Sequence, residues 1–175
     1  MNPRLMTLGL AATLAALACE SAPENSLGPE VLPPQFAANP VVQSVTGSGE
    51  IDDPISGEWR TFAFTAREYA DGTVEGEYER YNRRPGLGPS HGNVTCFTII
   101  GNQAWLGGFE EFGDRVGGDV AWRVVDNGEG KNAPPDQISL QSVQLPPGAA
   151  ASYCARKPNG PPLFDVVAGN IQVRP

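Results

Sequence analysis

Histidine and cysteine are scarce in this chain. His91 is the only histidine, and the three cysteines, Cys19, Cys96 and Cys154, form no C-x-x-C motif. A zinc site needs a set of Cys, His or carboxylate ligands, and a thioredoxin-like centre needs two closely spaced cysteines. The composition therefore argues against a zinc site and against dithiol redox chemistry, and we expect no cofactor.

Basic residues are also few. The chain has 12 Lys and Arg against 20 Asp and Glu, which gives a formal net charge of −8. Nucleic acids and anionic membrane surfaces attract proteins through positive charge. We therefore expect neither to be a partner of the folded domain, and the acidic balance is typical of a solvated surface.

The chain has one long apolar run, LMTLGLAATLAALA, which is too short to span a bilayer comfortably. Arg4 precedes the run, and Ala16-Leu17-Ala18 ends it directly before Cys19. The pattern predicts a signal peptide over residues 1–18. The same residues fit the end of a bacterial lipobox, although Ala16 occupies the position where Leu is commonest. We expect lipid on Cys19, and the alternative is a secreted or periplasmic soluble form with a free thiol.

A lipid on Cys19 would leave an even number of cysteines. We then expect Cys96 and Cys154 to form a disulfide in an oxidising compartment. The bridge would close a loop of roughly 60 residues, for which the chain-entropy relation gives about 4 kcal/mol of stabilisation. The predicted location is the bacterial cell envelope, outside the cytoplasm.

Residues 19–40 are rich in proline and glutamate. Such a segment cannot offset its ordering entropy by burial, so it predicts a disordered, semi-extended tether. Residues 41–175 then form a single β domain. A lipid, a tether and a domain are the expected layout of a lipoprotein that contacts the membrane through its N-terminal lipid only.

From Val41 onward, helical periodicity is weak and short alternating runs are separated by turn residues such as Asp71-Gly72. In residues 73–81, for example, Glu75, Glu77 and Glu79 share one face, which predicts a strand with one wet side. We expect no helix. The eight expected strands are 41–51, 58–68, 73–81, 93–102, 103–112, 116–127, 137–145 and 163–175.

About eight antiparallel strands in a chain of this length predict an all-β domain. We favour a small closed or partly closed barrel, and the alternative is a two-sheet β-sandwich.

The stretch GPSHG, residues 88–92, matches the G-x-S-x-G pattern of a hydrolase nucleophile elbow. That elbow requires a strand-to-helix turn, with an acid and a histidine later in the chain. Here a predicted strand follows Ser90, and His91 is the only histidine. Adjacent side chains on an extended segment point to opposite faces, so His91 is badly placed to serve Ser90. We interpret the stretch as a loop that enters a strand, and we expect no catalytic residues and no enzyme.

The loop VVDNGEGKNAPPDQ brings Asp126, Asn127, Glu129 and Asp136 together. Calcium binds oxygen ligands of this kind. The spacing is not that of an EF-hand loop, and Asn-Gly and Pro-Pro are ordinary turn residues. A structural turn is the favoured interpretation, a calcium site is the alternative, and no other metal site is expected.

Tryptophan, phenylalanine and tyrosine alternate along the predicted strands. We interpret them mainly as the hydrophobic core. Because a small barrel can hold one apolar ligand, an aromatic-lined cavity is the alternative. His91, Trp105 and Trp122 would then be possible residues of the ligand rim.

Five phrases of the expected domain occur in a characteristic order. They are VTGSGEI, RTFAFTARE, HGNVTCFTIIGNQAWLGG, WRVVDNGEGKNAPPDQIS and GNIQVR. Together, over residues 41 to 174, they resemble a group of exported bacterial proteins and lipoproteins of unknown function. The resemblance implies a single domain after a signal peptide, and it implies no activity, substrate or catalytic residue.

Two functional hypotheses follow. The first is a non-enzymatic, lipid-anchored β domain that serves as a binding or structural module of the cell envelope, with an unknown envelope protein or small ligand as its partner. The second is a carrier that holds a small apolar ligand in an aromatic-lined barrel cavity.

Overall fold

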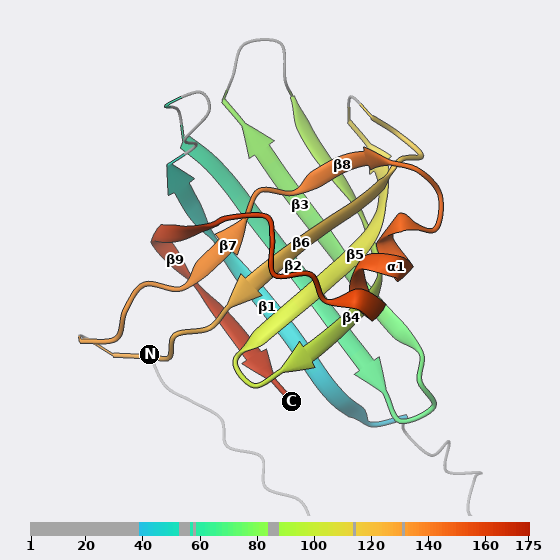
Figure 1. The fold of residues 1–175 in the computed structure, drawn as a ribbon, viewed down its shortest axis with the longest axis horizontal. Helices are drawn as coiled ribbons and strands as arrows, with labels where there is room; N and C mark the ends of the chain where they lie inside the picture. Colours follow the sequence, from blue (N-terminus) through green and yellow to red (C-terminus); the bar gives the residue numbers. More distant parts are fainter. Residues whose placement is uncertain (1–38, 53–56, 58, 84–87, 114, 131) are drawn as a thin grey trace, which may run out of the picture. The chain divides into compact units, whose positions relative to one another are not determined.

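The alternating runs of the sequence form strands, and these strands close into a barrel (Figure 1). The computed structural model describes residues 39–175 except 53–56, 58, 84–87, 114 and 131. Within this part of the chain the elements are β1 (Val41–Asp52), β2 (Trp59–Tyr69), β3 (Val74–Asn82), β4 (Pro89–Ile100), β5 (Gln103–Phe112), β6 (Asp119–Val125), β7 (Gln137–Ser139), β8 (Ser142–Leu145), α1 (Ala149–Arg156) and β9 (Leu163–Arg174).

All strand pairs are antiparallel, and eight strands complete the ring. Neighbours follow the order β1-β2-β3-β4-β5-β6-β7-β9, and β9 pairs again with β1. Strand β9 is long enough to serve both sides of this closure, because its first residues pair with β7 and the rest pair with β1. The predicted all-β barrel is therefore confirmed, and the sandwich alternative is wrong.

One predicted strand is divided in two. Strands β7 and β8 both pair with β6, opposite Val124–Val125 and opposite Asp119–Ala121 respectively. They occupy one position in the ring, with an interruption at residues 140–141 and a positive φ of 57° at Gln144. Only β7 continues the hydrogen bonding to β9, so β7 closes the barrel.

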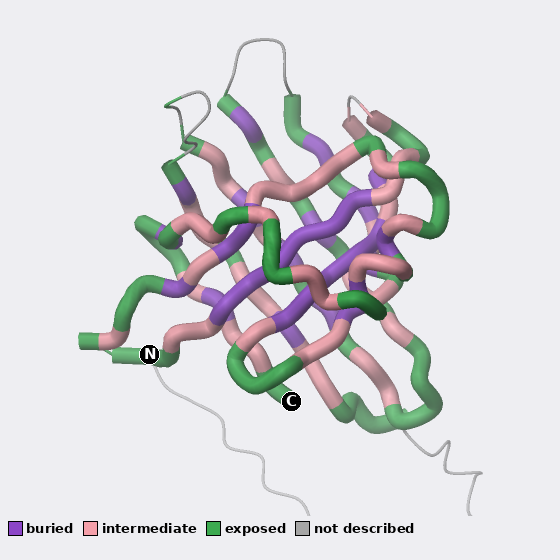
Figure 2. Tube along the Cα trace, viewed as in Figure 1, coloured by how far each residue is buried: buried purple, intermediate pink, exposed green. Residues whose placement is uncertain are grey.

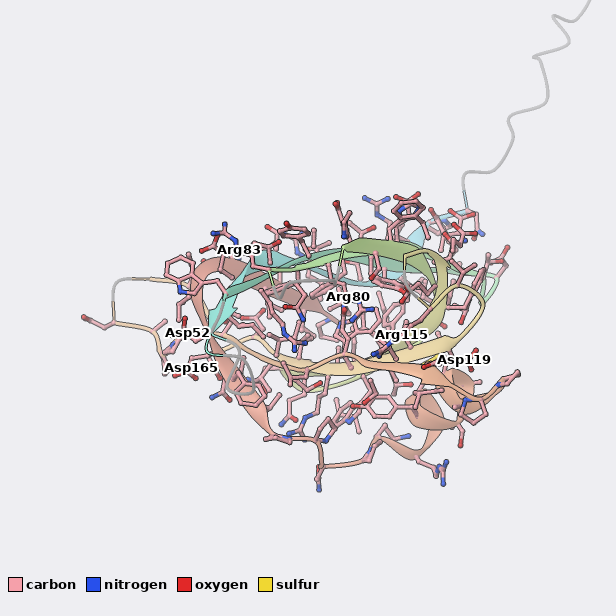
Figure 3. All side chains as sticks on the ribbon, turned by 90° about the horizontal axis from the view of Figure 1, so that it is seen from above. Asp52, Arg80, Arg83, Arg115, Asp119 and Asp165 are labelled. Carbon is pink, nitrogen blue, oxygen red and sulfur yellow. A yellow bond between two sulfur atoms is a disulfide. The ribbon has the colours of Figure 1, made fainter. Side chains whose placement is uncertain are left out.

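Aromatic side chains fill the interior of the barrel. Trp122 of β6 is completely buried, and its ring lies 5.9 Å from Phe64 and 5.4 Å from Tyr78 between ring centroids. These contacts join β2 and β3 to the opposite wall of the barrel, as tilted and edge-on aromatic pairs commonly do in protein cores. Figure 3, viewed from above, shows the ring of strands around this packed centre.

Helix α1 covers the outside of the barrel over β4, β5 and β6. Backbone amides in the first turn of a helix have no partner within the helix. Here Asp119 Oδ2 accepts a hydrogen bond of 2.9 Å from Ala150 N–H. The helix packs closely on β5 because residue 107 is a glycine. A Cβ at this residue would lie 2.9 Å from the carbonyl oxygen of Ala150. Strands β5 and β6 are consequently buried on both faces and form the longest purple runs in Figure 2.

The structure corrects one expectation and confirms another. No helix was expected, whereas α1 is present, and a disulfide between Cys96 of β4 and Cys154 of α1 holds it to the barrel. The predicted Cys96–Cys154 pairing is thus confirmed. The predicted signal peptide, Cys19 and nearly all of the predicted tether lie outside the described residues.

Candidate functional site

The three residues considered for a ligand rim lie in three different environments. His91 is exposed on the outer face of β4, where its ring stacks on Phe112 at 5.2 Å. Trp105 is buried on the outside of β5, and its Nε1 donates a hydrogen bond of 2.9 Å to the carbonyl of Pro158. Trp122 lies at the centre of the barrel. The structure therefore does not bring these residues together around one cavity.

The acidic loop between β6 and β7 uses its carboxylates to hold backbone. Asp136 accepts hydrogen bonds from the N–H groups of Asn127 and Ile171, at 2.8 and 2.7 Å. Asp126 accepts from the N–H groups of Gly128 and Val173, at 2.8 and 2.9 Å. These bonds fix the loop to β9, which is the role of a structural turn.

The other two residues of the calcium alternative also have protein partners. Glu129 accepts hydrogen bonds from Asn170 and Gln172, and Asn127 donates to the carbonyl of Pro135. No group of three or more His, Cys, Asp or Glu side chains that could hold a metal ion occurs among the residues the structure describes.

Ser90 of the GPSHG stretch faces the inside of the barrel, and His91 faces outward. Ser90 Oγ accepts a hydrogen bond of 2.6 Å from Arg80 Nε, and Arg80 Nη2 forms a salt bridge of 3.1 Å with Glu110 Oε2. Glu110 also accepts a bond of 3.0 Å from the Arg115 amide, which ties the β5–β6 turn to this group. Arg80 therefore lies between the walls at one end of the barrel (Figure 3).

This inward-facing polar group is a structural element of the barrel end. The Glu110 side chain is completely buried, so its negative charge depends on the Arg80 guanidinium for compensation. Nearby, burial raises the pKa of the Tyr78 phenol, and the negative charge of Glu110 adds to this effect. The Tyr78 hydroxyl and Trp122 Nε1 are buried without a hydrogen-bond partner in the described structure.

A large concave surface lies on the outside of the barrel. It has a volume of about 770 Å³ and extends over β9, β1, β2, β3 and β4 to Glu111 of β5. We call it the outer groove. Its outward-facing lining residues are Thr46, Ser48, Ala63, Thr65, Glu77, Glu79, His91, Asn93, Glu111, Asn170 and Gln172.

Strand register arranges ten of these side chains in two rows that cross five strands. The first row is Gln172, Thr46, Thr65, Glu77 and Asn93. The second row is Asn170, Ser48, Ala63, Glu79 and His91. Within each row every residue is paired directly with the next one across neighbouring strands, so the side chains of a row are adjacent on one face of the sheet.

Side-chain length varies along each row of the groove. The residues from β1 and β2 are short, and those from β9 at one end of the rows and from β3 and β4 toward the other end are longer. Hydrogen bonds hold side chains at both ends of the rows, since Asn93 donates to Glu111 at 2.7 Å and Asn170 donates to Glu129 at 2.8 Å. The groove is therefore formed by ordered side chains on paired strands.

The outer groove is acidic. Glu77, Glu79 and Glu111 contribute three carboxylates, and no Lys or Arg is present among its described lining residues. Amide and hydroxyl groups supply the other polar atoms. Such a surface offers many hydrogen-bond acceptors, together with amide and hydroxyl donors, and it repels anions.

A second, very small pocket is lined by the end of β1, the start of β2, the end of β3 and the segment from β7 to residue 141. Its volume is about 30 Å³, and its lining includes Ile51, Phe62 and Ile138. A space of this size accommodates about one water molecule. The outer groove, in contrast, is large enough for a ligand.

The sequence predicted one wet strand face that lines the outer groove. The alternation in residues 73–81 placed Glu77 and Glu79 on a wet strand face, which the structure confirms. The adjacency of Glu77 to Thr65 and Asn93 was not predicted. It depends on the register between separate strands, and the local pattern carries no signal for that register.

No protein-family model, curated protein or solved structure matches this chain. Within the part of the chain that the structure describes, α1 is too short to cross a membrane, and no other helix there is long and apolar enough to do so. The disulfide is consistent with an extracytoplasmic domain, since such bonds persist in oxidising compartments.

Proposed function

We propose that this protein is a non-enzymatic binding module of the bacterial cell envelope, anchored through lipid on Cys19, and that its ligand occupies the outer groove. The observation that carries this proposal is the pair of in-register polar rows on the outer face. The outer groove has a volume of about 770 Å³, which falls within the range of ligand sites in proteins.

The polar lining of the groove supports binding rather than a purely structural role. A barrel can remain folded with any soluble side chains on its outer face, so stability does not require short residues between longer ones along each row. Recognition does require concavity and several hydrogen-bonding groups that are held in place. Cross-strand pairing and the Asn93–Glu111 and Asn170–Glu129 bonds provide that order.

The environment of Ser90 supports the non-enzymatic part of the proposal. A serine nucleophile requires a base that accepts its proton, whereas Ser90 Oγ accepts a hydrogen bond from the guanidinium of Arg80, which is a donor. The apolar-carrier hypothesis receives less support, because Phe64, Tyr78 and Trp122 pack against one another in the space that such a ligand would need.

The proposal is tested by filling the groove. The protein would be produced with Cys19→Ser, so that no lipid contributes, and its cosedimentation with an isolated bacterial envelope preparation would be measured. Thr65→Trp places a large ring on the groove floor, whereas Ala155→Trp places the same ring on the exposed face of α1, outside the groove. We expect Thr65→Trp to lower the bound fraction and Ala155→Trp to leave it unchanged. Equal binding by the two variants would contradict the proposal.

A further inference from the structure

The outer groove runs across the strands rather than along them. Each row passes from β9 through β1, β2 and β3 to β4, and β1, β2 and β3 are paired on both sides. A peptide that binds by adding a strand needs a free strand edge with unpaired backbone groups. The floor of this groove offers no such edge, so its ligand is recognised by side chains.

The dimensions of the two rows suit an extended, linear ligand. Neighbouring strands lie about 4.8 Å apart, so five strands span about 19 Å across the sheet. The rows are two residues apart along each strand, which corresponds to about 7 Å. The lining of the groove therefore extends farther across the strands than along them, and nine of the ten residues in the two rows are polar.

The chemistry of the lining suits a ligand with many hydroxyl groups. Carboxylates accept hydrogen bonds from hydroxyls, and the amides of Asn93, Asn170 and Gln172 both donate and accept. An acidic ligand would meet Glu77 and Glu79 with no cation from the described lining to compensate for its charge.

Exposed aromatic rings lie beside the second row. Phe112 is 55% exposed and stacks on His91 at one end of that row, and Tyr81, 42% exposed, follows Glu79 on the same face of β3. Aromatic rings combine a flat apolar face with polar edges or hydroxyls, and they commonly anchor ligands that are partly apolar and partly polar. The C–H face of a sugar ring is a surface of that kind.

We infer that the ligand of the outer groove is a linear polysaccharide without acidic groups, lying across the strands and contacting Glu77, Glu79 and the His91–Phe112 pair. This inference rests on the proposed function, because it names the chemical class of ligand for the same groove. The exclusion of acidic sugars follows from the three carboxylates of the lining.

The test uses defined hexasaccharides and isothermal titration calorimetry with the Cys19→Ser protein. The probes are hexamers of glucose, N-acetylglucosamine and glucosamine, each β-1,4-linked, with hexagalacturonate as the acidic counterpart and hexalysine as a cationic peptide. We expect at least one of the three non-acidic saccharides to bind and hexagalacturonate not to bind. Thr65→Trp should weaken saccharide binding by about tenfold or more, which corresponds to about 1.4 kcal/mol, and Ala155→Trp should not.

A second pair of variants separates the effect of a carboxylate in the groove from the effect of the protein's net charge. Glu79→Gln keeps the size of the side chain and removes one carboxylate from the groove, and Asp165→Asn removes a carboxylate of β9 that is not part of the groove. We expect Glu79→Gln to weaken binding of the non-acidic saccharide and Asp165→Asn to have no effect. An equal effect of both changes would show that only net charge matters, and it would overturn the inference.

The outcomes distinguish this inference from the proposed function. If Thr65→Trp abolishes binding to envelope material but no hexasaccharide binds, or hexalysine alone binds, the groove is a binding site and the polysaccharide inference is overturned. Binding of hexagalacturonate in preference to the other saccharides also overturns it. If a saccharide binds equally to the parent protein and to Thr65→Trp, both the site and the inference are wrong.

Discussion

Tyr78→Phe tests the description of the barrel interior, because it removes one buried polar atom and leaves the aromatic packing. The Tyr78 ring lies 5.4 Å from Trp122, and its hydroxyl is buried without a partner in the described structure. An unpaired buried hydroxyl costs about 1–3 kcal/mol. We expect the variant to be more stable than the parent by about 1 kcal/mol at pH 7.

The same substitution has a larger expected effect at high pH. Burial raises the pKa of Tyr78, whereas a tyrosine in the unfolded chain titrates near its ordinary value of about 10. Above that pH the unfolded state loses this proton while the native state keeps it, so stability falls as the pH rises. The loss is about 1.4 kcal/mol per pH unit for one such group above that pH. Phenylalanine at residue 78 removes this loss.

The assay is urea denaturation followed by circular dichroism at pH 7 and at pH 11. The advantage of Tyr78→Phe should increase by about 1.4 kcal/mol between these two pH values. Burial also raises the pKa of Tyr153, but that residue is present in both proteins and its contribution cancels. Tyr81→Phe is the matched control, because the Tyr81 ring is on the surface. A Tyr78→Phe protein that is less stable at pH 7, or that has the same pH dependence as the parent, would refute this reasoning.

Three further changes test other parts of the structure. Glu110→Ala should destabilise the barrel by about 3 kcal/mol in thermal or urea denaturation, because it leaves the Arg80 guanidinium without its buried partner. Replacing Cys96 and Cys154 together with alanine should lower the free energy of unfolding by up to about 4 kcal/mol, since the bridge closes a long loop. Mass spectrometry of the mature protein should find a diacylglyceryl group on Cys19.

Each of these predictions has a result that would contradict it. A change below about 1 kcal/mol in Glu110→Ala would mean that the salt bridge makes no net contribution. An unchanged midpoint in the double alanine variant would mean that α1 stays in place without the bridge. An unmodified Cys19 at the mature N-terminus would contradict the lipid anchor.

The strands could be predicted from the sequence because each is a local pattern. Alternation of exposed and buried residues marked residues 73–81, and turn residues such as Asp71-Gly72 separated the runs. The division between β7 and β8 was missed because residues 137–145 read as one alternating run. That division depends on pairing with β6 and on the positive φ of Gln144, which the local sequence does not reveal.

Helix α1 was missed for a physical reason. It has only eight residues, and so short a segment is not stable as an isolated helix. Its stability comes from the disulfide, from Asp119 and from the space above Gly107, all of which are contacts with distant strands. The disulfide itself could be predicted, since counting cysteines requires no knowledge of the fold.

The candidate site was the part least accessible from the sequence. Trp105 and Trp122 are both on alternating strands, yet Trp105 lies on the outside of β5 and Trp122 faces the core. The alternation showed which residues of one strand share a face, but it did not show which face of each strand points into the barrel. His91 lines the outer groove, which is not the aromatic-lined barrel cavity whose rim it was expected to form. Its direct neighbour in the second row is Glu79 of β3, and Ser48 of β1 lies farther along the same row. Only the three-dimensional register places these residues in one row.

Chemical-shift mapping by nuclear magnetic resonance tests the central claim most directly. The Cys19→Ser protein would be titrated with the best-binding non-acidic hexasaccharide while its backbone amide signals are recorded. We expect the largest shifts at both rows, for example at Thr46, Thr65, Glu77 and Glu79, and no shift at α1. Shifts concentrated at α1 or at the inward-facing residues of the barrel, with the rows unchanged, would contradict the assignment of the outer groove as the binding site.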